Sequence, residues 1–315
     1  MLFRRLAFFV ALALLAAWGN PGPLAAQAQP VVRIAASAAE TYAQAFYAQD
    51  QGLYQKVGLN NVEVQTLATG AAVLTGVAGG AVDVGVGTTV GLANAITRGV
   101  PFVMIAPAAM TTPKAPTGLM CVGKNSPYKT AKDLDGQTIA VPALKQTADL
   151  AVRVWLTQNG VDLAKVHIIE APFAEMGPAV ERGTYAAATI SEPALTRAMK
   201  AGGIRCIGDP FGSIAPEYMF SAWFTTKQFA EKNPDVVKKI AAALTEAGKW
   251  ANSHHFESAA VVSKINKVDV DTIRAEVRPL YAEEIKLSEI QPQLDAGFKF
   301  GFLTRAVNAG ELYNR

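Results

Sequence analysis

Residues 62–89 contain two strand-to-helix turns in close succession, and this arrangement constrains the fold more than any other part of the sequence. A strand-like alternation over residues 62–67 ends at Ala68-Thr69-Gly70, where a helical pattern begins. A second apolar strand, residues 82–86, ends at Gly87-Thr88-Thr89, and either threonine can cap the next helix. Ligands of open α/β sheets bind beyond the carboxyl ends of the strands. We therefore expect these two turns to form part of a binding surface.

The same order of strand, turn and helix recurs along most of the chain. Further strands are expected over residues 31–36, 102–106, 118–122, 138–141, 166–169, 186–190 and 219–225. After the last of these strands we expect helices, one starting at Pro234 with Asn233 as its cap, and others over 257–265, 271–277 and 288–300. The proline-rich segment 107–116 separates two such runs. This organisation predicts an α/β protein of two lobes, each built on a mainly parallel sheet flanked by helices.

The N-terminus has the pattern of a secretory signal peptide. Arg4 and Arg5 precede an apolar run over residues 6–18, and Ala26-Gln27-Ala28 has the form of a cleavage site. Without residues 1–28, which hold two basic and no acidic residues, the formal net charge falls from +3 to about +1. We therefore expect an exported, periplasmic protein, cleaved near Ala28. Its small net charge does not favour binding to nucleic acid.

The two cysteines leave two interpretations open. Cys121 and Cys206 both lie in apolar, strand-like runs. An exported protein can form a disulfide between them, but two buried thiols that pack as small apolar side chains fit the same pattern.

A series of short motifs resembles the exported substrate-binding proteins of ABC importers for nitrate, sulfonates, taurine and thiamine-pyrimidine precursors. The motifs extend over nearly the whole chain after the signal peptide, and they occur at residues 46–54, 58–59, 70–74, 79–84, 98–101, 132–136, 139–141, 187–193 and 224–226. The resemblance implies a two-lobed periplasmic-binding-protein fold of type II, with two hinge crossings. It further implies a first lobe of residues 29–112 and 225–315, onto which the C-terminal helices pack, and a second lobe of residues 113–224.

The resemblance also places a ligand between the lobes, on turns that follow strands. The matching positions here are Ser37, Thr69, Gly70, Thr88, Thr89, Lys145, Gln146, Thr147, Phe173 and Glu192. Tyr42 lies near the first of these turns and could stack on a ligand, whereas Trp155 fits core packing.

Each polar position among these residues has a second interpretation. The threonines can be ordinary turn or cap residues, with Thr147 capping the helix that follows it. Lys145 can be a surface charge or the partner of an anionic ligand. Glu192 can cap a helix or receive an amine or ring N–H.

Motifs of catalysis are missing from the sequence. It contains no nucleophile elbow, zinc-protease motif, phosphate-binding loop or dinucleotide fingerprint. His254 and His255 fit the charged end of a helix better than a metal site. We expect no catalytic residue, metal or cofactor.

The sequence therefore predicts a monomeric receptor that binds a small polar, anionic or aromatic molecule by hinge closure and delivers it to an ABC permease in the inner membrane. One alternative is an enzyme on the same fold that resembles a pyrimidine synthase with iron and a cysteine-rich cluster. The two distant cysteines and the export signal argue against it. Another alternative is a receptor that feeds a sensor. The sequence leaves the ligand's identity open.

Overall fold

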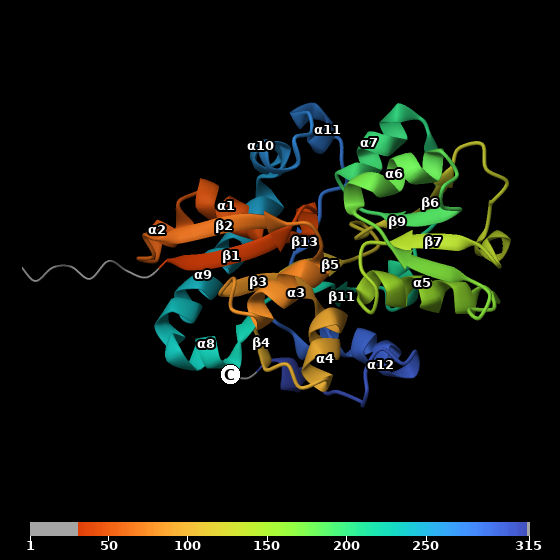
Figure 1. Cartoon of the computed structure of the whole chain (residues 1–315). Helices are drawn as coiled ribbons and strands as arrows, with labels where there is room; N and C mark the ends of the chain where they lie inside the picture. The colour runs from red at the N-terminus through yellow and green to blue at the C-terminus, as the bar shows by residue number, and fades with distance from the viewer. Residues whose placement is uncertain (1–30, 314–315) are drawn as a thin grey trace, which may run out of the picture. The chain divides into compact units, whose positions relative to one another are not determined.

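Two five-stranded sheets organise the part of the chain that the structure describes (Figure 1). The structure is a computed structural model, and it describes residues 31–313. The predicted signal peptide, residues 1–28, lies outside these described residues.

The first sheet has the strand order β2-β1-β3-β12-β4. Pairing of β1 with β2 and β3 is parallel, whereas β12 is antiparallel to both of its neighbours, so β12 is the one reversed strand of this sheet. The bounds of these strands, in chain order, are β1 (Val32–Ser37), β2 (Val62–Leu67), β3 (Val84–Thr88), β4 (Phe102–Pro107) and β12 (Ser221–Thr226). The strand expected at 219–225 thus brings the chain back into the first sheet.

Helices from both ends of the chain pack around this sheet. They are α1 (Gln44–Asp50), α2 (Leu53–Lys56), α3 (Gly70–Ala78), α4 (Thr89–Thr97), α8 (Lys227–Lys232) and α9 (Pro234–Ser253). The long helix α9 contacts α1, α2 and β4. The buried indole of Trp223 on β12 donates a hydrogen bond to the side-chain oxygen of Gln44 on α1 at 2.8 Å. This bond ties the returning strand to the N-terminal helix.

The second sheet repeats the plan with the order β10-β6-β9-β7-β8. Here β7 is parallel to β8 and β9, and β6 is the one reversed strand. Its elements are β6 (Leu119–Gly123), β7 (Thr138–Val141), α5 (Thr147–Gln158), β8 (His167–Glu170), α6 (Phe173–Glu181), β9 (Ala187–Ile190), α7 (Ala194–Ala201) and β10 (Ile204–Gly208). Figure 1 shows α6 and α7 beside β9 and β6. In each sheet four of five strands therefore run the same way, which confirms the mainly parallel architecture.

A disulfide joins the two cysteines across this second sheet. Cys121 on β6 and Cys206 on β10 lie directly opposite each other in the antiparallel pair, and their sulfur atoms are bonded. The disulfide is thus the one of the two open interpretations that the structure supports. A sequence cannot choose between them because strand register decides whether two cysteines meet.

A small third sheet corrects the expectation for residues 107–116. Part of this predicted break forms β5 (Ala109–Thr111), which pairs on both sides, with β11 (Tyr218–Met219) and β13 (Leu280–Tyr281). Proline and small residues suggested a loop there, but the partners of β5 come from far along the chain and no local pattern reveals them.

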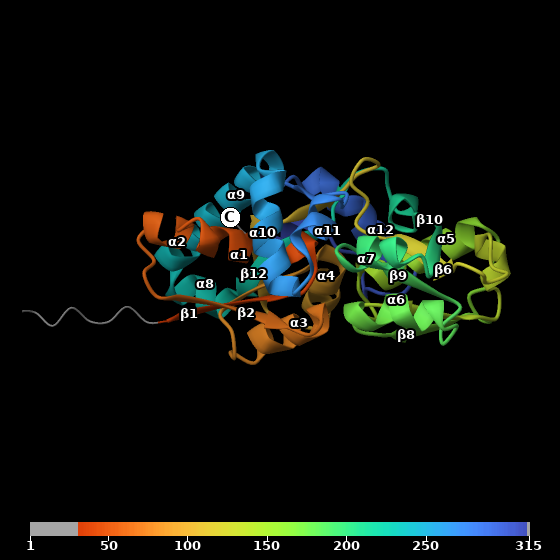
Figure 2. The same cartoon turned by 90° about the horizontal axis from the view of Figure 1, so that it is seen from above.

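The C-terminal helices reach elements of both sheets. They are α10 (His255–Asn266), α11 (Val270–Arg274) and α12 (Gln291–Lys299). Helix α10 contacts α1 and α9 (Figure 2), whereas α11 contacts α7, and α12 contacts both α4 and α5. Among the described residues, no helix combines the length and apolar character that crossing a membrane requires.

Candidate ligand-binding site

Two helix starts follow strands of the first sheet, and threonine side chains cap both of them. Thr69 accepts a hydrogen bond from the backbone N–H of Ala72 at the start of α3, at 3.2 Å. Thr88 accepts from the N–H of Gly91 at the start of α4, at 3.1 Å. The interpretation of both residues as caps is confirmed. Remaining N–H groups of these first turns point toward the carboxyl edge of the sheet, where a helix start favours an acceptor oxygen.

A glutamine from the second sheet's side reaches these helix starts. Gln146 is the residue before α5, and the Thr88 hydroxyl donates to its side-chain Oε1 at 3.3 Å. Gln146 is buried. This contact links a turn of the first sheet to a turn of the second.

A small cavity lies where turns from both sheets meet. Its volume is about 20 Å³, which accommodates roughly one water molecule. Five of the predicted site residues line it, namely Tyr42, Gly70, Thr88, Gln146 and Phe173. The other lining residues are Thr41, Pro142, Ala143, Ala148, Ser191, Phe211 and Phe220. We call this space the central cavity.

Aromatic rings form much of the wall of the central cavity. Tyr42 stacks on Phe220 with 6.1 Å between ring centroids, and Phe211 meets Phe220 edge to face at 5.8 Å. Burial raises the pKa of the Tyr42 hydroxyl, so this hydroxyl stays protonated at neutral pH. Such a wall can cover the apolar part of a ligand, while Thr41, Thr88 and Ser191 offer hydroxyls.

Six predicted site residues do not line the central cavity. Ser37 and Thr89 are buried, and Thr89 donates to backbone carbonyls of Met219 and Phe220. Thr69 acts as the cap described above. Lys145 has a backbone φ of 57° and lines a neighbouring hollow of about 320 Å³, with its Nζ 4.7 Å from the ring centroid of Phe302. Thr147 and Glu192 also lie outside the lining of the cavity.

Thr147 is not the helix cap that the sequence suggested. The cap position belongs to Gln146, and Thr147 is the first helical residue of α5. Its hydroxyl is buried and has no hydrogen-bond partner among the described residues. The prediction failed because α5 begins one residue earlier than the threonine pattern indicated, so that the cap position falls on Gln146.

Glu192 lies one residue before the cap position of α7, which Pro193 occupies, and its side chain accepts hydrogen bonds from the first turn of this helix. Its two carboxylate oxygens accept from the backbone N–H and the hydroxyl of Thr196 in the first turn of α7, both at 2.9 Å. The same residue also lines two small hollows beside the central cavity. Burial raises the pKa of Glu192, against the two hydrogen bonds from Thr196, which lower it.

Glu192 belongs to a group of charged side chains that we call the carboxylate cluster: Glu40, Glu192, Glu276 and Arg278. Glu40 and Arg278 form an ion pair whose side chains are only 1% and 6% exposed. Tyr47 also donates to Glu40 Oε1, at 3.1 Å. Among the described residues, Glu40 Oε2 and both carboxyl oxygens of Glu276 lack a hydrogen-bond partner.

The cluster contains more carboxyl groups than its single arginine can neutralise. Burial, together with the charges of Glu40 and Glu192, raises the pKa of Glu276 well above its usual range. Burial opposes the charged form of Arg278, but the Glu40 carboxylate outweighs it and raises the pKa of the guanidinium. Glu276 therefore retains a proton at neutral pH while Arg278 stays charged.

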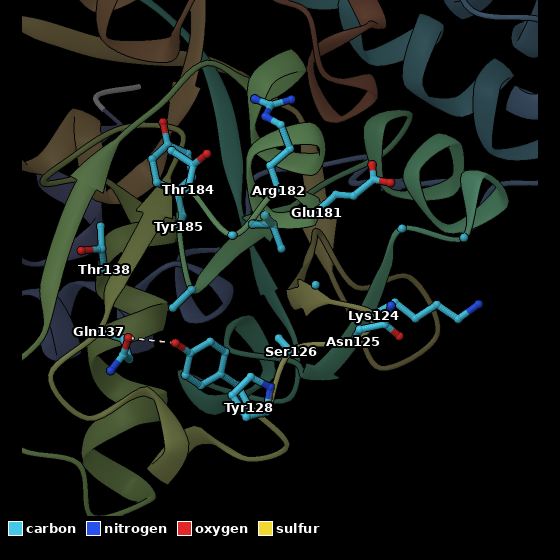
Figure 3. Close-up of a pocket in the computed structure, with 17 residues that line it drawn as sticks. Lys124, Asn125, Ser126, Tyr128, Gln137, Thr138, Glu181, Arg182, Thr184 and Tyr185 are labelled. Atoms are coloured by element: carbon cyan, nitrogen blue, oxygen red, sulfur yellow. Dashed lines mark hydrogen bonds between the residues drawn. The ribbon is translucent and has the colours of Figure 1, made fainter.

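A larger hollow lies elsewhere on the second sheet (Figure 3). It measures about 660 Å³ and is lined by loops, among them those that precede β7 and β9. The Tyr128 hydroxyl donates to Gln137 at 3.0 Å, while Lys124 and Arg182 extend in different directions in Figure 3. It lies at the amino ends of these parallel strands, opposite the edge where α/β sheets bind ligands, and its charged groups do not converge.

Several lining residues of the central cavity escaped the sequence analysis. Thr41 and Phe211 lie outside the predicted turns, Phe220 lies inside the strand expected at 219–225, and Ser191 directly precedes the predicted residue Glu192. A run of aromatic residues near glycine and proline, at 210–220, was the available signal for Phe211 and Phe220. Within residues 31–313, no group of three or more His, Cys, Asp or Glu side chains is placed to hold a metal ion.

Comparison with known proteins identifies the family. The sequence model of the NMT1-like family matches residues 25–266, and the chain belongs to this family. A curated relative from Escherichia coli (strain K12), named as an aliphatic sulfonates-binding protein, is 26% identical over 152 residues. That match covers 48% of this chain and 46% of the relative, so the chain spans about half the length of that curated relative.

Solved structures show the periplasmic-binding-protein fold. The periplasmic aliphatic sulphonate binding protein SsuA from Escherichia coli superposes with a TM-score of 0.71 at 20% identity, covering 90% of this chain and 97% of that chain. SsuA from Xanthomonas axonopodis pv. citri, bound to MOPS, gives 0.74 at 16% identity, covering 91% and 99%. The periplasmic nitrate-binding protein NrtA from Synechocystis PCC 6803 gives 0.74 at 18% identity, covering 90% and 84%. The predicted fold class is confirmed.

Proposed function

We propose that this member of the NMT1-like family is the ligand-binding component of an ABC-type importer. The observation that carries the proposal is the central cavity, which collects residues from turns of both sheets at the carboxyl ends of their strands. The names of the similar proteins, which describe binding of sulfonates or nitrate, support the same role. We infer a binding protein rather than an enzyme on these grounds.

The size of the central cavity implies that binding involves a change of shape. Ligand pockets usually measure about 300–1,000 Å³, whereas this cavity measures about 20 Å³. We infer that the structure represents a closed state and that the two lobes separate to admit a ligand. The proposed lobes are residues 29–112 with 225–315, and residues 113–224. The ligand stabilises the closed state because it contacts both lobes.

The groups around the cavity favour a small molecule with one polar end and an apolar body. Thr88 and the starts of α3 and α4 can receive an acceptor group, and the aromatic wall can cover the rest. We infer a monomeric receptor in the periplasm, exported by its leader, that delivers this ligand to a permease in the inner membrane. Delivery to a sensor uses the same closure, and a transport assay with the permease distinguishes the two.

Ligand screening by thermal unfolding tests the proposal. The purified protein is heated with alkanesulfonates, taurine, nitrate, aromatic carboxylates and pyrimidines, and native mass spectrometry examines the protein as purified. We expect at least one compound to raise the midpoint temperature in a concentration-dependent way. The Phe220→Ala variant, which opens the aromatic wall, should reduce that shift. If no compound stabilises the protein and no small molecule co-purifies, the proposal fails.

A further inference from the structure

Gln146 occupies the space between two helix starts, and two glycines leave room for it. An ideal Cβ on Gly70, at the start of α3, would lie 3.1 Å from Gln146 Oε1. A Cβ on Gly91, in α4, would lie 3.2 Å from Gln146 Cγ. These distances place the Gln146 side chain beside both helix starts, and its amide oxygen accepts one hydrogen bond there, from Thr88 at 3.3 Å. We call Gly70, Thr88, Gly91 and Gln146 the Gln146 region.

The position of this oxygen suits a stronger acceptor than an amide. Helices α3 and α4 each have nine residues, and their N-terminal ends carry partial positive charge. An anionic oxygen gains more there than the neutral amide does. The hydroxyl of Thr147, buried and without a partner in the described part of the chain, shows that polar groups beside Gln146 are not fully satisfied.

Gln146 also separates two spaces of different size. It lines the central cavity, and it lines the neighbouring hollow of about 320 Å³ together with Lys145, Asn94 and Arg98. Its Nε2 atom has no hydrogen-bond partner in the described residues, so only one hydrogen bond holds the side chain in place. A rotation about its side-chain bonds would move the amide into the larger hollow, where polar side chains can receive it.

We propose that Gln146 is a built-in competitor and gate: its amide oxygen fills the acceptor position in the closed, ligand-free protein, and an incoming anionic oxygen displaces it. This inference rests on the proposed function and adds a residue that sets affinity and selectivity. Neutral ligands, whose acceptors are no stronger than an amide, gain nothing from the exchange. Ligands with an anionic oxygen gain the difference between the two acceptors.

A ligand-free experiment tests the acceptor position directly. Gln146→Glu places a carboxylate oxygen where the amide oxygen lies, and we expect its midpoint of thermal unfolding at pH 7.5 to rise by about 1–4 °C. The matched control is Gln55→Glu, an added charge at an exposed position on α2, with an expected change of less than about 1 °C. A midpoint for Gln146→Glu below that of the wild type, with the control unchanged, would overturn the proposal.

A binding experiment tests the competition. Methanesulfonate and nitrate are titrated calorimetrically into wild type, Gln146→Ala, Gln146→Glu and Gln55→Ala. We expect Gln146→Ala to bind these anions about 2- to 10-fold more tightly than the wild type. Gln146→Glu should bind them at least about 10-fold more weakly than the wild type. Gln55→Ala should bind with wild-type affinity. Equal or weaker binding to Gln146→Ala overturns the proposal. If neither probe binds any of these proteins, the anion specificity of the proposed function fails, and the ligand-free experiment alone decides the role of Gln146.

Discussion

The Gln146 region contributes to the wall of the central cavity, the carboxylate cluster lies beside that wall, and the two regions manage buried polar groups in opposite ways. The Gln146 region is formally neutral, and a single bond of 3.3 Å holds its glutamine side chain. The carboxylate cluster contains three carboxyl groups and one guanidinium, held by a dense set of contacts. A weakly held neutral group can be exchanged for a ligand atom at little cost, whereas a buried ion pair cannot. We therefore assign ligand exchange to the first region and structural stability to the second.

The two regions are also expected to respond to different conditions, one to ligands and the other to pH. The Gln146 region responds to ligands, because its oxygen competes with theirs. The carboxylate cluster responds to pH, because Glu276 retains a proton that the unfolded chain releases at neutral pH. Four predictions test this division, starting from the largest effect.

The largest effect is expected from Arg278→Met, which leaves Glu40 buried without its cation. Breaking a buried ion pair on one side costs about 3–5 kcal/mol, and both partners here are almost fully buried. Urea unfolding at pH 7 measures the loss. The control is Arg305→Met at the exposed pair with Glu311, where about 0–1 kcal/mol is expected. Equal losses in the two variants would show that the cluster is not the stabilising region.

The next effect is a pH dependence that depends on Glu276. The residue faces Glu40, Glu192 and Arg278, and its folded pKa is raised above the usual value of about 4.5. Between these two pKa values the folded protein holds a proton that the unfolded chain has lost, so stability falls as pH rises. Glu276→Gln removes this loss. We expect the variant to be more stable than the wild type by on the order of 1–3 kcal/mol at pH 8, and to match it near pH 4.5.

Urea unfolding from pH 4.5 to 8 measures the two curves. Glu231→Gln, at an exposed position, is the control and should leave the wild-type curve unchanged. Parallel curves for wild type and Glu276→Gln would show that no proton is held at Glu276.

These two regions also show what the sequence could and could not predict. Alternating strands and capped helices predicted the two sheets, because local periodicity and turn residues determine such elements. Thr69 and Thr88 were correctly recognised as cap candidates for the same reason. Arg278 and Glu276, by contrast, meet Glu40 from more than 230 positions away in the sequence. No local pattern predicts that contact, because strand β12 and the C-terminal segment first have to return to the N-terminal part of the fold.

A similar limit applies to the candidate site. The turns that follow strands predicted Gly70, Thr88 and Gln146, since parallel strands place their carboxyl ends at one edge. The sequence could not show that Gln146 reaches the starts of α3 and α4, because its side-chain direction depends on how the two sheets meet. Phe211 was missed since it lies in a short helical turn without a strand-to-helix pattern, and Phe220 since it lies in a predicted strand and not in a turn that follows one.

A medium loss of stability is expected when Thr88 is replaced, because its hydroxyl caps α4 and also donates a hydrogen bond to Gln146. Thr88→Val removes a cap and a hydrogen bond to Oε1, for a combined cost of about 1.5–3 kcal/mol. The control is Thr226→Val, which removes only the cap of α8, for about 1 kcal/mol. Urea unfolding gives both values. A double-mutant cycle with Gln146→Ala then isolates the energy of the Thr88–Gln146 hydrogen bond. A coupling energy of zero would show that this bond does not stabilise the protein.

The smallest effect on stability is expected at Lys145, which sequence analysis regarded as either a surface charge or an anion partner. Its side chain is exposed and contacts the Phe302 ring, an interaction of about 0.5–1 kcal/mol. Lys145→Met keeps the apolar stem and removes the charge. Lys267→Met is a matched control, because Lys267 is exposed and also has a positive φ, of 53°. Both variants should lose less than about 1 kcal/mol in urea unfolding.

Calorimetric titration of methanesulfonate then decides between the two interpretations of Lys145. If Lys145 attracts the anion from the hollow beside Gln146, its variant should bind about 2- to 5-fold more weakly than the Lys267 variant at low salt. The gap should close at 0.5 M salt, since an exposed charge is screened while the helix starts around Gln146 are covered. A gap that persists at high salt would mean that Lys145 contacts the bound anion, and no gap at either salt would leave it a surface charge. In each of these outcomes the anion still binds at the Gln146 region. This region contains no formal charge, so salt has no charged side chain to screen there.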